Sequence, residues 1–79
     1  MNTVIFAEEG GSSTWGIEAA SDRRRVGTIE QREDGFYVSP EGAAADLIAG
    51  IHPGPYRDLY EAMDAIAFTT GGACEPFES

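Results

Sequence analysis

The sequence predicts an α+β fold: an antiparallel β-meander of three to four strands packed against one C-terminal α-helix. Short alternating segments separated by glycine- and aspartate-rich turns fill the first 40 residues, and one capped amphipathic segment follows residue 57. With 79 residues the chain is long enough for one domain with a thin core. We therefore expect a single domain over 1–79, with residues from about 72 to 79 as a flexible tail.

Two strands are predicted before the first turn that contains arginines. Residues 3–7 (TVIFA) are apolar and β-branched, which is typical of a strand buried on both faces. Residues 14–20 (TWGIEAA) alternate, so Trp15, Ile17 and Ala19 share one face of a half-buried strand.

The next strand, residues 26–31, departs from strict alternation. Val26 and Ile29 are three residues apart, which places them on opposite faces of a regular strand. Glycine inside a strand often marks a β-bulge. We therefore predict a bulge at Gly27 that brings both side chains to the core.

The last predicted strand of the meander is residues 36–39. A turn at 32–35 (REDG) precedes it, and Phe36 and Val38 share one face. Pro40 ends the strand because it has no N–H to donate. If residues 36–39 or 3–7 form an exposed edge, that edge offers homodimer pairing across a two-fold axis.

The link over residues 40–57 is rich in glycine and proline. Ala44, Leu47, Ile48 and Ile51 have helical spacing, but DLIAGI also fits a short strand. The sequence leaves open whether residues 43–51 are helix, strand or loop. Leu47 and Ile51 are expected to reach the core in each case.

The final element is a helix that begins after Asp58. Asp58 as N-cap with Glu61 three residues later forms a capping-box signature, and Gly71 or Gly72 is placed to end the helix. The apolar stripe that is expected to cover the sheet consists of Leu59, Ala62, Met63, Ile66 and Thr70.

The charge balance bears on the class of partner. Fourteen acids against five arginines give a net charge of −9, and the chain has no lysine. Such a field opposes nucleic acid and anionic membranes, and it favours a basic partner or serves only solubility. Arg23, Arg24 and Arg25 lie in a predicted hairpin connection next to acids. This position favours a solvated turn, or a small positive protrusion that contacts an acidic protein patch, over a nucleic-acid site.

Few residues offer catalytic or metal chemistry. Cys74 is the single cysteine and His52 the single histidine, so an internal disulfide is impossible and a zinc site is close to excluded. A nucleophilic pair would require Cys74 and His52 in contact. We expect no cofactor and no metal, and a reducing, cytoplasmic location, because the first residues also lack the pattern of a signal peptide.

The leading functional hypothesis is a small, acidic, non-enzymatic module that binds a basic protein surface. One version is an inhibitor or DNA mimic of phage type. The alternative is a small-ligand or enzymatic site near His52 and a rim of tyrosines. The candidate partner-binding residues are Tyr37, Tyr56, Tyr60, Glu61, Asp64, Arg23, Arg24 and Arg25.

The pattern WGI…VGTIEQREDGFYVSP…YRDLYEAMDAI resembles that of small bacterial or phage proteins built as a meander plus one helix. Many unrelated domains share this pattern, so no residue role follows from it.

Overall fold

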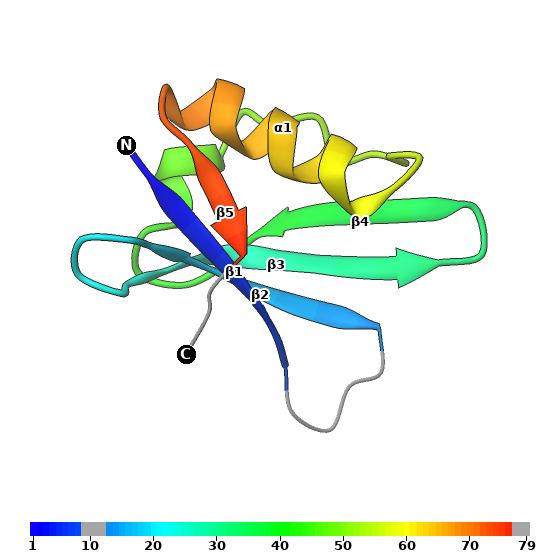
Figure 1. Cartoon of the computed structure of the whole chain (residues 1–79), viewed down its shortest axis with the longest axis horizontal. Helices are drawn as coiled ribbons and strands as arrows, with labels where there is room; N and C mark the ends of the chain where they lie inside the picture. The colour runs from blue at the N-terminus through cyan, green and yellow to red at the C-terminus, as the bar shows by residue number, and fades with distance from the viewer. Residues whose placement is uncertain (9–12, 77–79) are drawn as a thin grey trace.

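The computed structural model describes residues 1–8 and 13–76 and shows a sheet with one helix across it (Figure 1). The elements in chain order are β1 (Thr3–Ala7), β2 (Thr14–Ala19), β3 (Arg25–Arg32), β4 (Gly35–Pro40), η1 (Ala45–Ile48), α1 (Leu59–Thr70) and β5 (Cys74–Pro76). The predicted α+β class is confirmed.

The sheet has five strands in the order β4-β3-β2-β1-β5. The first four are sequential antiparallel neighbours, which confirms the predicted meander. β5 pairs parallel to β1, with Cys74 opposite Thr3. Residues 74–76 of the predicted tail therefore form a strand of the sheet, and residues 77–79 lie outside the described part of the chain.

The predicted bulge lies in β3. Gly27 pairs with Ile17 and Arg25 pairs with Glu18, so Val26 is the extra residue opposite a shift in register. Val26 and Ile29 are both fully buried. The bulge lets two side chains three residues apart reach the same core.

The link after β4 contains the short 3₁₀ helix η1, which settles the structure of residues 43–51. Ile48 at its end is completely buried, and Leu47 and Ile51 pack against the core as expected. After η1 the chain returns along the outer side of β4 and forms an isolated bridge between Phe36 and Tyr56.

Both edges of the sheet offer little to a further strand. On β4, the Phe36 N–H donates to the Tyr56 carbonyl at 2.9 Å and the Val38 N–H donates to the Pro53 carbonyl at 2.9 Å. β5 is three residues long and ends at Pro76, which has no N–H. The prediction that residues 3–7 form an edge is wrong, because β1 lies between β2 and β5. Residues 36–39 do lie at an edge, but returning chain already occupies it.

Helix α1 begins and ends as its caps predict. The Glu61 N–H donates to Asp58 Oδ1 at 2.8 Å, and the Arg57 N–H donates to Glu61 Oε1 at 3.4 Å. The Glu61 carboxylate thus accepts the backbone N–H of Arg57, the residue before the N-cap, rather than the N–H of Asp58 itself. Gly71 ends the helix with φ 73°, a conformation that glycine adopts without strain.

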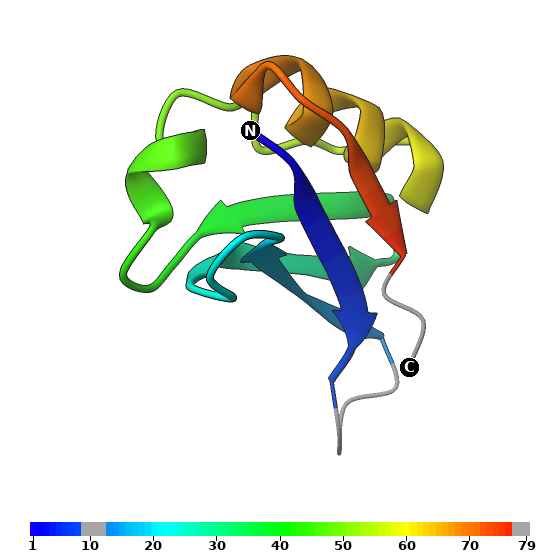
Figure 2. The ribbon, with the colours of Figure 1, turned by 60° about the vertical axis from the view of Figure 1, so that its left-hand side comes forward.

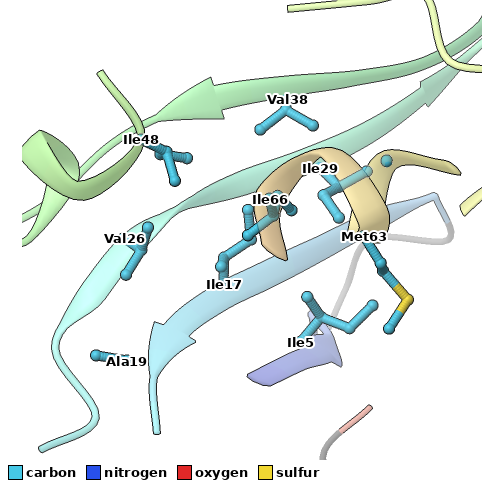
Figure 3. Close-up of a cluster of buried hydrophobic side chains, with 10 residues drawn as sticks. Ile5, Ile17, Ala19, Val26, Ile29, Val38, Ile48, Met63 and Ile66 are labelled. Atoms are coloured by element: carbon cyan, nitrogen blue, oxygen red, sulfur yellow. The ribbon is translucent and has the colours of Figure 1, made fainter. Parts of the chain in front are cut away.

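The core lies between α1 and one face of the sheet (Figure 2). Side chains from four strands, η1 and α1 point toward one another there (Figure 3). Of the predicted sheet face, Ile17, Ile29 and Val38 are fully buried. Trp15 and Phe36 are half-buried at its end, with ring centroids 5.7 Å apart.

Candidate functional site

The three consecutive arginines do not form a cationic surface. Arg23 adopts φ 62° in the turn after β2, and its Nε lies 2.6 Å from Glu18 Oε1. Arg24 pairs with Asp22 at 3.2 Å, and Arg25 on the neighbouring strand pairs with Glu8 at 2.6 Å. Each guanidinium therefore faces a different carboxylate. Arg23 and Arg24 lie in the predicted turn, whereas Arg25, which was placed in the same connection, begins β3.

The remaining two arginines are paired as well. Arg32 pairs with Glu30, and Arg57 pairs with Glu61 at 3.9 Å. All five positive side chains of the chain are thus engaged by five of the fourteen acids. Within the described ranges, the carboxylates without an arginine partner are Glu33, Asp34, Glu41, Asp46, Asp58, Asp64 and Glu75.

One exposed surface combines carboxylates with large aromatic side chains: the α1 outer face, formed by Tyr60, Glu61, Asp64 and Phe68. Asp64 is its carboxylate without an arginine partner, whereas Glu61 pairs with Arg57. At about 100° per residue these four positions span an arc of about 100° around the helix. Tyr60 is 72% exposed and Phe68 is 90% exposed. The buried residues of α1, Ala62, Met63 and Ile66, lie on the opposite side.

The structure brings three predicted site residues, Tyr60, Glu61 and Asp64, onto this face. Phe68 was missed, although a sequence signal for it existed. It falls outside the predicted apolar stripe and lies four residues after Asp64 and eight after Tyr60, which places it on the same side of a helix. Together with Tyr60, Phe68 places two large exposed aromatic rings on this face.

An apolar hollow of about 280 Å³ adjoins the start of this face. Its lining includes Trp15 from β2 and Leu59, Tyr60 and Met63 from the first turns of α1. Tyr60 thus belongs to both the hollow and the α1 outer face. The described surface offers a recess at one end of the helix and a protruding phenyl ring at the other.

The other two predicted tyrosines lie elsewhere. Tyr37 alternates with buried Val38, so its ring lies on the sheet face away from α1. Its hydroxyl donates to Asp34 Oδ2 at 2.6 Å, which raises the pKa of Tyr37, and Arg32 stacks 4.8 Å from the ring centroid. Tyr56 donates its hydroxyl to the His52 carbonyl. Tyr37 and Tyr60 therefore do not form one rim.

His52 and Cys74 are not a catalytic pair. His52 precedes the segment that covers β4, whereas Cys74 begins β5 at the opposite edge of the sheet. Four strand spacings of about 4.8 Å, roughly 19 Å measured along the sheet, lie between these edges. The Gly54 N–H donates to His52 Nδ1 at 3.0 Å, and burial raises the pKa of the Cys74 thiol.

The described residues were compared with the requirements of a metal site and of a membrane-spanning helix, and they meet neither. Over residues 1–8 and 13–76, no three histidine, cysteine, aspartate or glutamate side chains gather as a metal site requires. In the same ranges no helix has the length and apolarity that crossing a bilayer demands.

Comparison of the chain with protein-family models, with curated proteins and with solved structures finds no significant match.

Proposed function

We propose that this protein is a non-enzymatic interaction module that binds a basic surface of another protein. The observation that supports this function is the complete pairing of the arginines. Each of the five guanidinium groups faces a carboxylate of the same chain, so nine acids carry the whole net charge of −9. Docking of an acidic partner through Arg23, Arg24 and Arg25 is disfavoured, because it requires breaking these pairs.

The charge also defines how such a module associates. A field of one sign attracts an oppositely charged surface and raises the association rate, and added salt weakens both effects. A basic site that normally holds nucleic acid is one surface of this kind. The DNA-mimic version of the proposal is the case in which the module occupies such a site.

The wide separation of His52 from Cys74 supports a binding function over a hydrolytic one. The polar groups around His52 bond one another, since its Nδ1 accepts from Gly54 and its carbonyl accepts from Tyr56. A ligand at His52 competes with these local hydrogen bonds.

The experiment is affinity capture from the native host, followed by binding measurements with the purified partner. We expect a partner with a strongly basic surface that is retained at about 50 mM salt and released at about 500 mM. A duplex DNA competitor tests the DNA-mimic version, because it displaces the module only from a nucleic-acid site. Retention that does not change with salt, or an acidic partner, contradicts the proposed function.

A further inference from the structure

The α1 outer face contributes little to the fold. The packing of α1 on the sheet is made by Ala62, Met63 and Ile66, which are fully or almost fully buried. Phe68 is 90% exposed on the other side. Phenylalanine forms helices less readily than alanine or glutamate, so helix stability does not account for it at an exposed position.

The two aromatic residues form a pair with a defined spacing. Tyr60 and Phe68 are eight residues apart, which is about 12 Å along a helix that rises 1.5 Å per residue. Asp64 lies midway between them and Glu61 beside them. Single exposed apolar residues are normal, but two large rings with carboxylates between them on one helix face form a patch of the kind found in interfaces.

We propose that the α1 outer face is the docking surface for a partner with an apolar pocket or groove rimmed by arginine or lysine. Phe68 and Tyr60 enter the apolar part, and Asp64, which has no arginine partner, faces the cationic rim. This inference rests on the proposed function, and it deepens it by naming the surface and the chemistry of the partner. The contact is a helix face laid into a groove, with anchors two turns apart.

The negative charge of this face favours a partner with a cationic rim over a second copy of the chain. Two copies meeting through α1 bring Asp64 and Glu61 of each against the same carboxylates, with a net charge of −9 on both sides. Like charges facing each other across an interface are unfavourable, whereas a cationic rim complements them. A nucleic acid or an anionic membrane meets the same repulsion.

The test uses two probes of equal positive charge. One is an amphipathic leucine–lysine peptide, whose apolar stripe is flanked by lysines, and the other is an oligolysine. We expect the wild-type chain to bind the leucine–lysine peptide at least about tenfold more tightly, because an aromatic anchor of an interface typically contributes that much or more. Phe68→Ala is expected to abolish this preference while leaving oligolysine binding unchanged.

Matched variants compare the effect on peptide binding of substitutions on the α1 outer face with that of substitutions outside it. Thr69→Ala changes the neighbouring exposed residue and is expected to keep the preference. Asp64→Asn is expected to weaken binding of both peptides more than Asp46→Asn, which removes one exposed charge from η1 instead. All four substituted side chains are exposed, and circular dichroism verifies that each variant is folded.

The outcomes distinguish the two proposals. Binding of both peptides with no effect of Phe68→Ala overturns the docking surface and leaves the acidic module standing. Binding of neither peptide contradicts both proposals. Self-association of the wild type that Phe68→Ala removes, measured by light scattering, also overturns the inference, because the face is then a contact between copies.

Discussion

At the scale of single residues, the close approaches in the sheet explain where glycine is required. At Gly27 in the bulge of β3, a Cβ would lie 2.3 Å from the Ser39 carbonyl oxygen on β4 and 3.0 Å from Ile48 Cδ1. The nearest of these atoms is backbone, which cannot turn aside as a side chain can. The bulge therefore depends on the missing side chain as much as on the buried Val26 beside it.

Gly27→Ala is expected to destabilise the fold by about 1–3 kcal/mol, because β3 and β4 must separate to admit the methyl group. In a chain of this size that lowers the melting temperature by about 4–8 °C per kcal/mol. Thermal and urea denaturation followed by circular dichroism measure the change. Gly50→Ala is the control, because nothing lies within 4 Å of a Cβ there. Equal effects of the two substitutions contradict the close approach as the cause.

At the scale of elements, the sequence predicted those whose signal is local. The alternation around Trp15 and Val38 and the cap and stripe after Asp58 each lie within one segment, and the structure confirms the meander and the helix. β5 was missed because three residues that include a proline carry no periodicity. Its pairing of Cys74 with Thr3 joins the two ends of the chain, which no local pattern reports.

In the candidate site, too, the sequence predicts what local spacing determines and misses what depends on tertiary packing. Tyr60, Glu61 and Asp64 were chosen from the residues around the helix start, and they share a face because helical spacing is regular. Phe68 has the same spacing, but it lies outside the buried stripe, which is the pattern that predicts the helix. Tyr37 lies on the sheet face away from α1, and no local pattern could place it relative to the helix, because the stacking of sheet and helix depends on tertiary packing.

The N-cap of α1 gives a prediction at the scale of one element. Asp58→Ala removes the carboxylate that accepts the Glu61 N–H at 2.8 Å, so we expect a loss of about 1 kcal/mol of unfolding free energy. Urea denaturation measures it. Asp64→Ala removes the same charge from an exposed position within α1 and is expected to change stability by less than about 0.5 kcal/mol. An Asp58→Ala variant as stable as Asp64→Ala contradicts the capping role.

At the scale of the whole molecule, charge and shape act together. The chain measures 32 × 26 × 19 Å and carries a net charge of −9. The sheet edges are covered by returning chain on β4 and shortened at β5, so strand addition is not the readiest route to a partner. What remains open to association is the charged outer surface and the aromatic side chains on the α1 outer face.

This charge makes the stability of the fold depend on salt in a predictable direction. At about 0.01 M salt the Debye length is about 30 Å and covers the whole molecule, whereas at about 0.15 M it is about 8 Å. The net charge corresponds to 36 repulsive pairs, each costing about 0.3 kcal/mol at about 15 Å in water. The five exposed or half-exposed ion pairs, which contribute little individually, weaken as well.

Repulsion outweighs attraction in this comparison, because folding brings the nine uncompensated charges closer together than they are in the unfolded chain. We therefore expect the melting temperature, measured by circular dichroism, to rise by several degrees between these two salt concentrations. The double variant Glu41→Gln and Asp46→Asn removes two unpaired charges and is expected to show a smaller rise. A melting temperature that falls with added salt means that the five ion pairs contribute more to stability than the net charge costs.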